Sequence, residues 1–444
     1  MRVLERRFQL SEHGTTAGRE VFAGLTTFLT MAYIVFVQPA VLSAAGMDFG
    51  AVMVATCLST AIATALMALL ANYPIAVAPA MGHNFFFAYS VVVGMKVPWQ
   101  VALGAVAIAG LAFVLTAGIG LRERVITAIP SSLKHAIAAG IGLLIAMVGL
   151  QWSGLVVASP GTLVTLGSLH SAPVAVALIG LAVTAGLMAR GVTGALLWGI
   201  LASAAVAMPL GILRYQGIAG VPPSLAPTFM QLDVAGALTP GMVPVVLVFF
   251  FLALFDSIGT LVAVGEQAGL MKDGSLPRAK QALLADAVGT VVGAGLGTST
   301  VTAYIESGAG VASGGRTGLT ALVTAGLFLA TIFVSPLVRM IGGGYAPTPG
   351  GLTLYPVVAP PLIIVGAMII GTVRDIDWRD PTEGIPAFLT MVMMPLAVSI
   401  TEGVAFGVVA YTVLKTVAGR GRQVHPLLYV FALLFVLRYA FLRS

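Results

Sequence analysis

Five of the 16 acidic residues lie within or at the edge of long apolar segments. A charged side chain at the middle of a membrane-spanning helix costs about 2.5–3.5 kcal/mol, so it is expected to face a cavity, a partner or a ligand. No Lys or Arg lies at a similar depth in the sequence. A carboxyl group in such a place must carry a proton, bind a cation or accept hydrogen bonds. The five are Asp256, Glu266, Asp286, Glu306 and Glu402.

Asp256 and Glu306 are the strongest candidates for a binding site. Asp256 lies deep in a span that begins near Pro240 and carries no polar side chain before it. Glu306 follows a run of glycines and small hydroxyl residues, which suits a broken helix whose free N–H groups point into a cavity. For both acids the alternative is a structural carboxyl group that neighbouring hydroxyls or a helix cap satisfy. For Asp286 and Glu402 that structural or capping role is the favoured interpretation, and Glu266 is equally well read as an interface residue.

A second broken segment, residues 78–94, contains Asn84 and a run of phenylalanines. The Asn84 side chain offers a donor and an acceptor together, as the edge of a heterocycle requires. Phe85 and Phe86 could stack on a flat ring. Phenylalanines in membrane spans also commonly pack against lipid or core, and an Asn can cap a helix end, so both alternatives stay open.

Three further residues near these segments are weaker candidates. Thr260 and Ser307 could lend hydroxyl groups to a ligand, although hydroxyls in spans more often bond their own backbone. His83 could relay protons, but a lone histidine is more simply explained as structural. Cys57 is the single cysteine, so no disulfide or multi-cysteine metal site is expected. No phosphate-binding loop or H-E-x-x-H motif occurs, and we expect neither a metal nor a cofactor.

The composition shows what must position these residues. The chain has 444 residues, 59% hydrophobic and 9% charged, which is too few charges for a water-facing surface. The apolar runs are continuous rather than alternating, which excludes a transmembrane β-barrel. The formal charge of +6 comes from basic residues in loops without interleaved aromatics, so nucleic acid is not expected as a partner. The sequence predicts an all-α polytopic protein in a lipid bilayer, the inner or plasma membrane.

Apolar runs between charges and Pro or Gly breaks predict fourteen segments, seven on each side of a Pro-rich connection. The predicted divisions are a cytoplasmic N-terminus at 1–19, a first repeat at 20–212, a connecting loop at 213–240, a second repeat at 241–418 and a C-terminal tail at 419–444. The segments are 20–42, 52–71, 78–94, 99–120, 133–152, 172–190, 192–212, 241–270, 281–297, 299–313, 317–339, 352–372, 384–400 and 402–418.

Loop charges predict the orientation. Most Lys and Arg residues fall on one side of these segments, which places both termini in the cytoplasm. The first 18 residues lack the apolar core of a cleaved signal peptide. The apolar stretch 425–442 could span the membrane or lie on it, and we favour the interfacial helix because a fifteenth span would put the C-terminus outside.

An odd number of segments in each half means that the second half enters the membrane in the opposite sense. If the halves are homologous, they are inverted repeats, as in many secondary transporters. A shift of 222 or 223 residues lays the broken piece around Asn84 over the one around Glu306, and lays Tyr33 over Asp256. Corresponding broken segments indicate a binding site near the midplane of the membrane.

Three motifs carry a family resemblance: Ala23-Gly-Leu-Thr-Thr-Phe-Leu-Thr-Met-Ala-Tyr33, Phe255-Asp-Ser-Ile-Gly-Thr260 and Glu306-Ser-Gly-Ala-Gly-Val-Ala-Ser-Gly-Gly-Arg-Thr-Gly318. They resemble the AzgA-type hypoxanthine/guanine permeases, a branch of the nucleobase transporter superfamily that includes uracil and xanthine permeases. The resemblance covers nearly the whole chain. It implies fourteen segments in two inverted repeats of seven, discontinuous third and tenth segments, and a core and a gate domain.

The resemblance also implies a substrate site between the third, eighth and tenth segments. The family's two acids fall on Asp256 and Glu306, and its asparagine falls on Asn84. The third segment departs from the family pattern, because His83 stands where an aliphatic residue is expected and Phe85 where alanine is expected. These two positions bear on which purine is preferred.

The chemistry of the residues agrees with this function. One carboxylate, for which we choose Glu306, can accept the N1–H of a 6-oxopurine and the 2-amino group of guanine. Asp256 or Asn84 would hold the imidazole side, with Phe85 or Phe86 stacking on a face. We therefore expect a transporter, not an enzyme, that imports hypoxanthine, guanine or adenine with protons, with Asp256 the favoured proton site and Glu306 the second one. A homodimer is one assembly that we keep open.

Four other functions stay open at this point. A uracil/xanthine-type permease has the same ancestry. An anion transporter could share the architecture but would favour a basic or neutral site. A channel or receptor would not need two broken helices in an inverted repeat. An intramembrane enzyme could use Asp256 and Glu306 as a carboxylate dyad, and it would alter its ligand chemically, whereas a transporter returns it intact.

Overall fold

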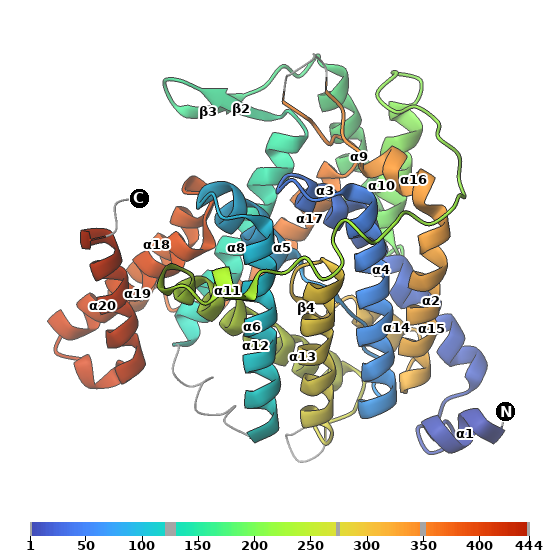
Figure 1. Ribbon diagram of the computed structural model, residues 1–444, viewed down its shortest axis with the longest axis horizontal. Coiled ribbons are helices and arrows are strands. Elements are labelled where there is room, and N and C mark those ends of the chain that lie inside the picture. The colour runs from blue at the N-terminus through green and yellow to red at the C-terminus, as the bar shows by residue number, and fades with distance from the viewer. Residues whose placement is uncertain (1, 120–129, 272–275, 347–351, 442–444) are drawn as a thin grey trace. The chain divides into compact units, whose positions relative to one another are not determined.

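The computed structural model describes residues 2–119, 130–271, 276–346 and 352–441, and helices dominate these ranges (Figure 1). Residue contacts divide the chain into two compact units. Unit 1 is Met1–Ile119 with Gln151–Pro361, and unit 2 is Gly120–Leu150 with Leu362–Ser444. Each unit therefore takes its segments from both halves of the sequence.

Most of unit 1 is helical, with four short strands. Its helices are α1 (Arg2–Phe8), α2 (Ala17–Met31), α3 (Ile34–Ser43), α4 (Phe49–Leu66), α5 (Met81–Phe85), α6 (Trp99–Ile119), α9 (Ala172–Ala189), α10 (Ala195–Ala207), α11 (Val234–Ala237), α12 (Val243–Gln267), α13 (Ala279–Leu296), α14 (Ser307–Ala312), α15 (Gly318–Thr331) and α16 (Ser335–Gly342). Its π-helices are η1 (Met67–Ala71) and η2 (Phe86–Gly94), and its 3₁₀ helices are η3 (Pro240–Met242) and η4 (Ile332–Val334). Its strands are β1 (Val77–Pro79), β2 (Val156–Ser159), β3 (Leu163–Leu166) and β4 (Val301–Ala303).

Unit 2 holds the C-terminal helices. They are α18 (Pro381–Leu396), α19 (Ile400–Val417), α20 (Pro426–Phe441), η5 (Ile370–Asp375) and η6 (Gly421–Gln423). Two helices run across the division between the units, α8 (Ser131–Trp152) and α17 (Ala359–Ile369).

Eight helical stretches in the described ranges are long and apolar enough to cross a membrane. They are Ala17–Ser43, Phe49–Ala71, Trp99–Ala117, Ser131–Trp152, Ala172–Ala189, Pro240–Gln267, Gly318–Gly342 and Ile400–Val417. Each coincides with a segment predicted from hydropathy. The count of fourteen stays a prediction, because the remaining segments are shorter, broken or less apolar.

Three long helices of unit 1 stand side by side: α13 packs against both α4 and α6 (Figure 1). Glycine permits the closest approach, since a Cβ on Gly289 would lie 2.6 Å from the Cβ of Ala63. A Cβ on Gly110 would similarly lie 2.9 Å from the side chain of Val291. These contacts pack α4, α13 and α6 closely side by side, next to the two broken segments. We call these three helices the wall.

The two broken segments meet as strands. β1 pairs with β4 in antiparallel register, Val77 with Ala303, Ala78 with Thr302 and Pro79 with Val301. Two threonines hold the strand beginnings in the same way. The Thr64 hydroxyl bonds both the N–H and the C=O of Val77, and the Thr290 hydroxyl bonds both of these groups on Val301. The interrupted backbone is thereby satisfied inside the protein, as membrane depth requires.

One acidic residue that the sequence analysis did not single out, Glu20, is buried. The carboxylate of Glu20 on α2 accepts the N–H groups of Arg316, Thr317 and Thr320 and the hydroxyls of both threonines. It therefore caps the N-terminus of α15, where free N–H groups and the helix dipole favour a negative charge. The sequence missed it because its partners lie about 300 residues away.

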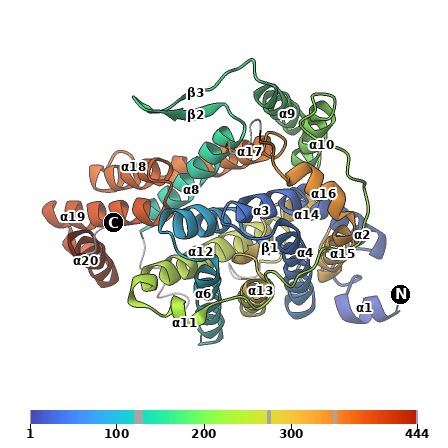
Figure 2. The same cartoon turned by 45° about the horizontal axis from the view of Figure 1, so that its top comes forward.

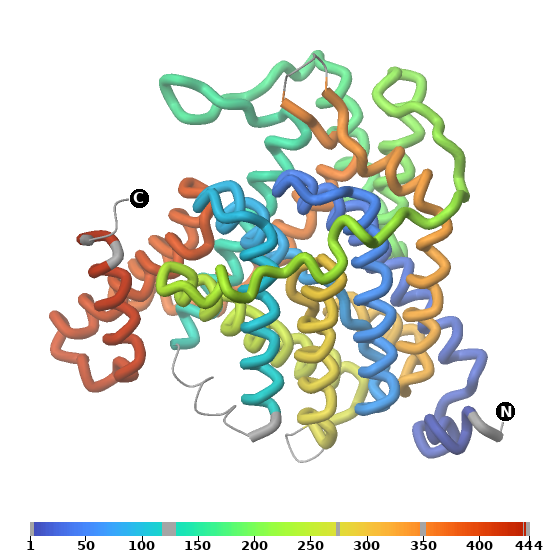
Figure 3. Tube along the Cα trace, viewed as in Figure 1, coloured from blue at the N-terminus to red at the C-terminus, as the bar shows by residue number. Residues whose placement is uncertain are grey.

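The Pro-rich connection between α10 and α12 crosses the ends of three helices (Figure 3). A Cβ on Gly50 of α4 would lie 2.9 Å from Pro223. The N–H of Met230 bonds the carbonyl of Gly295, the second residue from the end of α13, and the N–H of Asp233 bonds the carbonyl of Gln100 on α6. The predicted loop is thus tied to the wall of α4, α13 and α6.

A β-hairpin that the sequence analysis did not predict joins α8 and α9. Strands β2 and β3 pair from Val156 with Leu166 to Ser159 with Leu163, and the hairpin extends away from α9 and α10 (Figure 2). The turn contains Pro160 and Gly161, a pair that favours chain reversal. This signal was present in the sequence between two short runs of β-branched and apolar residues.

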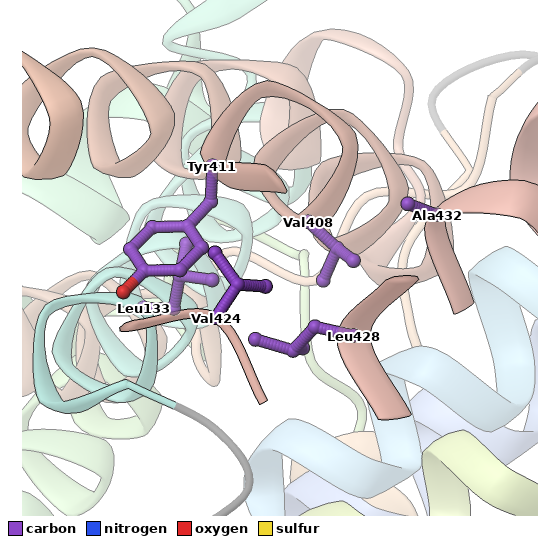
Figure 4. Close-up of a cluster of buried hydrophobic side chains, with 6 residues drawn as sticks. All are labelled: Leu133, Val408, Tyr411, Val424, Leu428 and Ala432. Atoms are coloured by element: carbon purple, nitrogen blue, oxygen red, sulfur yellow. The ribbon is translucent and has the colours of Figure 1, made fainter. Parts of the chain in front are cut away.

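Helix α19 holds unit 2 together. Leu133, Val408, Tyr411, Val424, Leu428 and Ala432 form its apolar cluster (Figure 4). At one end of α19, the Lys415 ammonium is 3% exposed and lies 2.7 Å from the Glu383 carboxylate and 3.6 Å from that of Asp380. Arg420 adds a second contact to Asp380 at 2.7 Å. The buried Lys415 of unit 2 is therefore paired with two carboxylates, those of Glu383 and Asp380.

We predict that Glu20→Ala destabilises the protein, because five donors lose their acceptor. A hydrogen bond to a charged group contributes about 1.5–3 kcal/mol, so the free energy of unfolding should fall by at least this amount. Glu20→Gln, which keeps one acceptor oxygen, should have an intermediate effect. Thermal unfolding in detergent measures both against Glu12→Ala, a change at an exposed acid. An unfolding temperature of Glu20→Ala equal to that of Glu12→Ala would contradict the capping role.

We predict a pH-dependent contribution from Asp380. Hydrogen bonds from Thr382, with help from Lys415 and Arg420, lower the pKa of Asp380 from 3.8 to about 2. A lowered pKa stabilises the fold above the unfolded value and loses that contribution as the pH falls through the folded value. The unfolding temperature of the unchanged protein should therefore exceed that of Asp380→Asn above about pH 4, and the two should converge near pH 2. Asp375→Asn, at an exposed pair with Arg374, is the control.

Candidate functional site

Asp256 lies near the middle of α12 and yet is not fully enclosed by the protein. Its side chain is 46% exposed, although the helix spans Val243–Gln267 and is mostly apolar. Its Oδ2 accepts a hydrogen bond of 2.9 Å from the hydroxyl of Thr302 in β4. Strand β4 therefore positions the carboxyl group of Asp256.

Glu306 immediately precedes α14 and is partly exposed. Its Oε1 accepts a hydrogen bond of 2.8 Å from the hydroxyl of Tyr33, a residue that is 1% exposed between α2 and α3. The backbone carbonyl of Glu306 also accepts a bond of 3.3 Å from Thr30. Thr30 on α2 and Tyr33 between α2 and α3 thus hold Glu306 in place. The sequence did not reveal this role for Tyr33.

The fold brings the two predicted acids together. Asp256 and Glu306 lie close enough to interact electrostatically, and each has a hydroxyl as its side-chain donor. Neither acid forms an ion pair with Lys or Arg among the residues that the structure describes. Two nearby carboxyl groups without a cation repel each other when both are ionised, so a proton or a ligand that donates hydrogen bonds is favoured there.

Asn84 belongs to a buried polar network that includes a residue the sequence analysis passed over. Its amide nitrogen donates to the side-chain oxygen of Gln38 on α3. The Gln38 amide in turn donates to the hydroxyls of Thr298 at 3.0 Å and Ser299 at 2.9 Å. The Asn84 side-chain oxygen has no hydrogen-bond partner in the structure. A lone glutamine inside the apolar run 34–42 was the available signal for Gln38.

The phenylalanines after Asn84 are packed in the interior. Phe85 stacks on Tyr89 with ring centroids 5.7 Å apart, and Phe86 meets Phe249 edge to face at 4.7 Å. Both are fully buried. In this conformation neither ring has a free face, so stacking on a ligand would require these side chains to move.

The weaker sequence candidates have mixed surroundings. The Ser307 hydroxyl accepts the N–H of Ala76 just before β1, so it supports the β1–β4 strand pair. Thr260 is 8% exposed, one turn after Asp256 on α12. The sequence favoured a structural role for His83, yet its Nδ1 lies 4.0 Å from Oδ2 of Asp256.

Asp286 on α13 is a third acid beside the β1–β4 strand pair. It is fully buried, and its Oδ2 accepts the N–H of Ala303 in β4 at 3.3 Å. Its Oδ1 has no hydrogen-bond partner. The bond to the strand agrees with the structural role favoured from the sequence.

Comparison with known proteins decides the class. Residues 18–406 match the model of the protein family described as "Permease family". The chain belongs to this permease family. It is 46% identical to the adenine permease AdeP of Escherichia coli over 99% of this chain and 96% of that protein. It is also 46% identical to the guanine/hypoxanthine permease PbuG of Bacillus subtilis, over 98% of this chain and 99% of that one.

The matches confirm the resemblance to AzgA-type purine permeases that the motifs indicated. The permease is an integral membrane transporter and not an enzyme, which removes the carboxylate-dyad alternative. Its fold also matches the transmembrane domain of the cyanobacterial bicarbonate transporter BicA, with a TM-score of 0.64 and 18% identity over 88% of this chain and 97% of that one. At this identity the likeness concerns the fold alone.

We predict that Tyr33→Phe destabilises the permease by about 1.5–3 kcal/mol, because Glu306 loses its hydroxyl donor without a change in ring packing. Thermal unfolding measures the effect, and Tyr215→Phe, at a residue 69% exposed, is the matched control. In a Glu306→Gln background the same change should cost less, since the carboxylate is then absent. Equal costs in both backgrounds would contradict the contact.

Proposed function

We propose that the permease imports purine nucleobases by proton symport. The observation that carries this proposal is the pair Asp256 and Glu306, which lie close enough to interact electrostatically, have hydroxyl donors and have no Lys or Arg partner in the described residues. An ion pair would fix these carboxyl groups in the charged state. Without it, they are available to a neutral ligand that donates hydrogen bonds and to a proton.

Glu306 is the proposed anchor of the substrate. Its Oε1 is oriented by Tyr33, and the acceptor capacity that remains on the carboxylate can receive the N1–H of hypoxanthine, and the 2-amino group of guanine as well. Adenine presents an amino donor beside a ring acceptor, so it would suit a protonated Glu306. Relatives named for each kind of purine are equally similar to this chain, so both kinds belong in the test.

Four further residues complete the proposed binding site. Asn84 has a free side-chain oxygen that could accept from the imidazole side of the purine, with Gln38 holding its amide. Phe85 or Phe86 would stack on a face after leaving its present neighbour. Thr260 and Ser307 would supply hydroxyls, and for Ser307 this means giving up its bond to Ala76.

Asp256 is the proposed proton site, with Glu306 as the second choice. Its open side chain can exchange a proton with the space that the substrate enters. Once it is protonated, its hydroxyl can still bond to Thr302, because a threonine hydroxyl both donates and accepts. We do not assign sodium to this role.

The same proposal includes the architecture. Thr64 and Thr290 make matching bonds to Val77 and Val301, which supports two inverted repeats of seven segments, 20–212 and 241–418. Broken third and tenth segments, a core and a gate domain, and cytoplasmic ends at 1–19 and 419–444 follow from that arrangement. A homodimer in the plasma or inner membrane is the proposed assembly.

The first experiment is uptake of labelled hypoxanthine, guanine and adenine into proteoliposomes that contain only this permease. We expect accumulation with an inward proton gradient, in sodium-free choline buffer, and none after the gradient is collapsed. Uptake that requires sodium would contradict the coupling. Uptake of uracil, xanthine or bicarbonate in place of these purines would contradict the substrate class.

Two variants separate binding from coupling. We predict that Glu306→Gln weakens hypoxanthine binding about 10- to 100-fold, because the carboxylate loses one charged acceptor. Asp256→Asn should still bind hypoxanthine but no longer accumulate it against a gradient. Glu266→Gln, at an exposed acid on the same helix, should behave like the unchanged permease. Unchanged hypoxanthine affinity in Glu306→Gln would contradict the binding role of Glu306. Accumulation driven by a pH gradient in Asp256→Asn would contradict the coupling role of Asp256.

A further inference from the structure

His83 is a buried imidazole whose ring nitrogens form no hydrogen bond of normal geometry, although one of them interacts with the backbone carbonyl of Leu252 on α12. The residue is 3% exposed, in the middle of α5. Leaving a buried polar atom unpaired is costly, and an apolar residue would avoid that cost. The carbonyl of Leu252 can engage one ring nitrogen at most, so a purely structural role leaves the other nitrogen without a partner.

The ring faces the carboxyl group proposed to carry the proton. Nδ1 of His83 lies 4.0 Å from Oδ2 of Asp256, about 1 Å beyond the length of a hydrogen bond. The same oxygen accepts the hydroxyl of Thr302. A small shift of either side chain would join His83 and Asp256 directly, while the open side of Asp256 stays available.

Few other titratable groups face this pair. Of the helices packed against α5, α12 contributes Asp256, and η2 contributes Tyr89, whose hydroxyl accepts the indole N–H of Trp152. Within α3, residues 34–43 include no titratable side chain. Glu306, Asp286 and Tyr304 lie close enough to interact electrostatically with Asp256. His83 is thus the one nitrogen base of the described residues that faces this group of acids.

We propose that His83 and Asp256 act as a coupled pair that shares the transported proton. The inference rests on the proposed proton symport and adds a second proton-binding residue to Asp256. With one proton the pair is neutral, whether the proton sits on the carboxyl group or forms a His83–Asp256 ion pair. Without it the pair is anionic. Interacting groups of this kind titrate together, and their apparent pKa values belong to the pair.

The first test measures hypoxanthine affinity between pH 5 and pH 8 for the unchanged permease, His83→Gln and His83→Leu. Glutamine keeps a donor but cannot titrate, whereas leucine is apolar and of similar bulk. We expect the midpoint of the pH dependence to shift by at least one pH unit in both variants, which is a tenfold change in affinity at a fixed pH. His170→Gln, at an exposed histidine, should leave the profile unchanged. Profiles of both His83 variants that superimpose on the original would overturn the proposal.

A second measurement needs no purine and separates this proposal from the proposed function. The difference in unfolding temperature between the unchanged permease and His83→Leu should vary with pH from 5 to 8, and this pH dependence should change in an Asp256→Asn background, because His83 then titrates without the acid to which it is coupled. A difference that is flat in the first background, or that varies equally in both, would overturn the coupled pair. Failure of purine uptake by the unchanged permease would instead contradict the proposed function.

Discussion

The antiparallel pairing of β1 with β4 is the constraint on which the candidate site depends. Backbone that leaves a helix inside a membrane protein must find all its hydrogen bonds within the protein. Here the two strands satisfy each other, and Thr64 and Thr290 complete the bonds at their first residues. Thr302 is the central residue of β4 and its hydroxyl also bonds Asp256. The pairing of β1 with β4 therefore fixes the position of the Asp256 carboxyl group as well. The permease thereby builds its site on a rigid element rather than on a loop.

The pairing of charges at the candidate site differs from that at two other places in the chain. In unit 2, Lys415 is buried with Glu383 and Asp380, so its charge is permanently paired. In unit 1, Glu20 is buried with five donors and is likewise fully satisfied. Asp256 and Glu306 have no cationic Lys or Arg partner in the described ranges. The chain can pair charges completely elsewhere, so the incomplete pairing of these two acids supports the proposal that a ligand and a proton bind there.

Hydropathy predicted much of the fold because helices that cross a membrane must be apolar over their own length. The segments 99–120, 133–152 and 172–190 lie within about two residues of α6, α8 and α9. The broken segments were visible because glycines and hydroxyl residues interrupt the apolar pattern near Asn84 and Glu306.

Pairings between distant parts of the chain were not predictable in this way. β1 meets β4 across more than 200 residues, and Glu20 caps a helix about 300 residues away. The partners of Gln38 and His83 are likewise brought in by folding, so their surroundings could not be read from neighbouring residues. Asp256 and Glu306 were identifiable because the cost of burying an acid depends on its own segment.

The hydroxyl partners of the two acids explain how one site can accept both protonation states. A hydroxyl donates to a carboxylate and accepts from a protonated carboxyl group by rotating its hydrogen. Thr302 and Tyr33 can therefore stay bonded to Asp256 and Glu306 before and after a proton arrives. A lysine in either place would donate only, so a protonated acid beside it would leave a buried charge unpaired. Hydroxyl donors next to these carboxyl groups thus suit the proposed proton coupling.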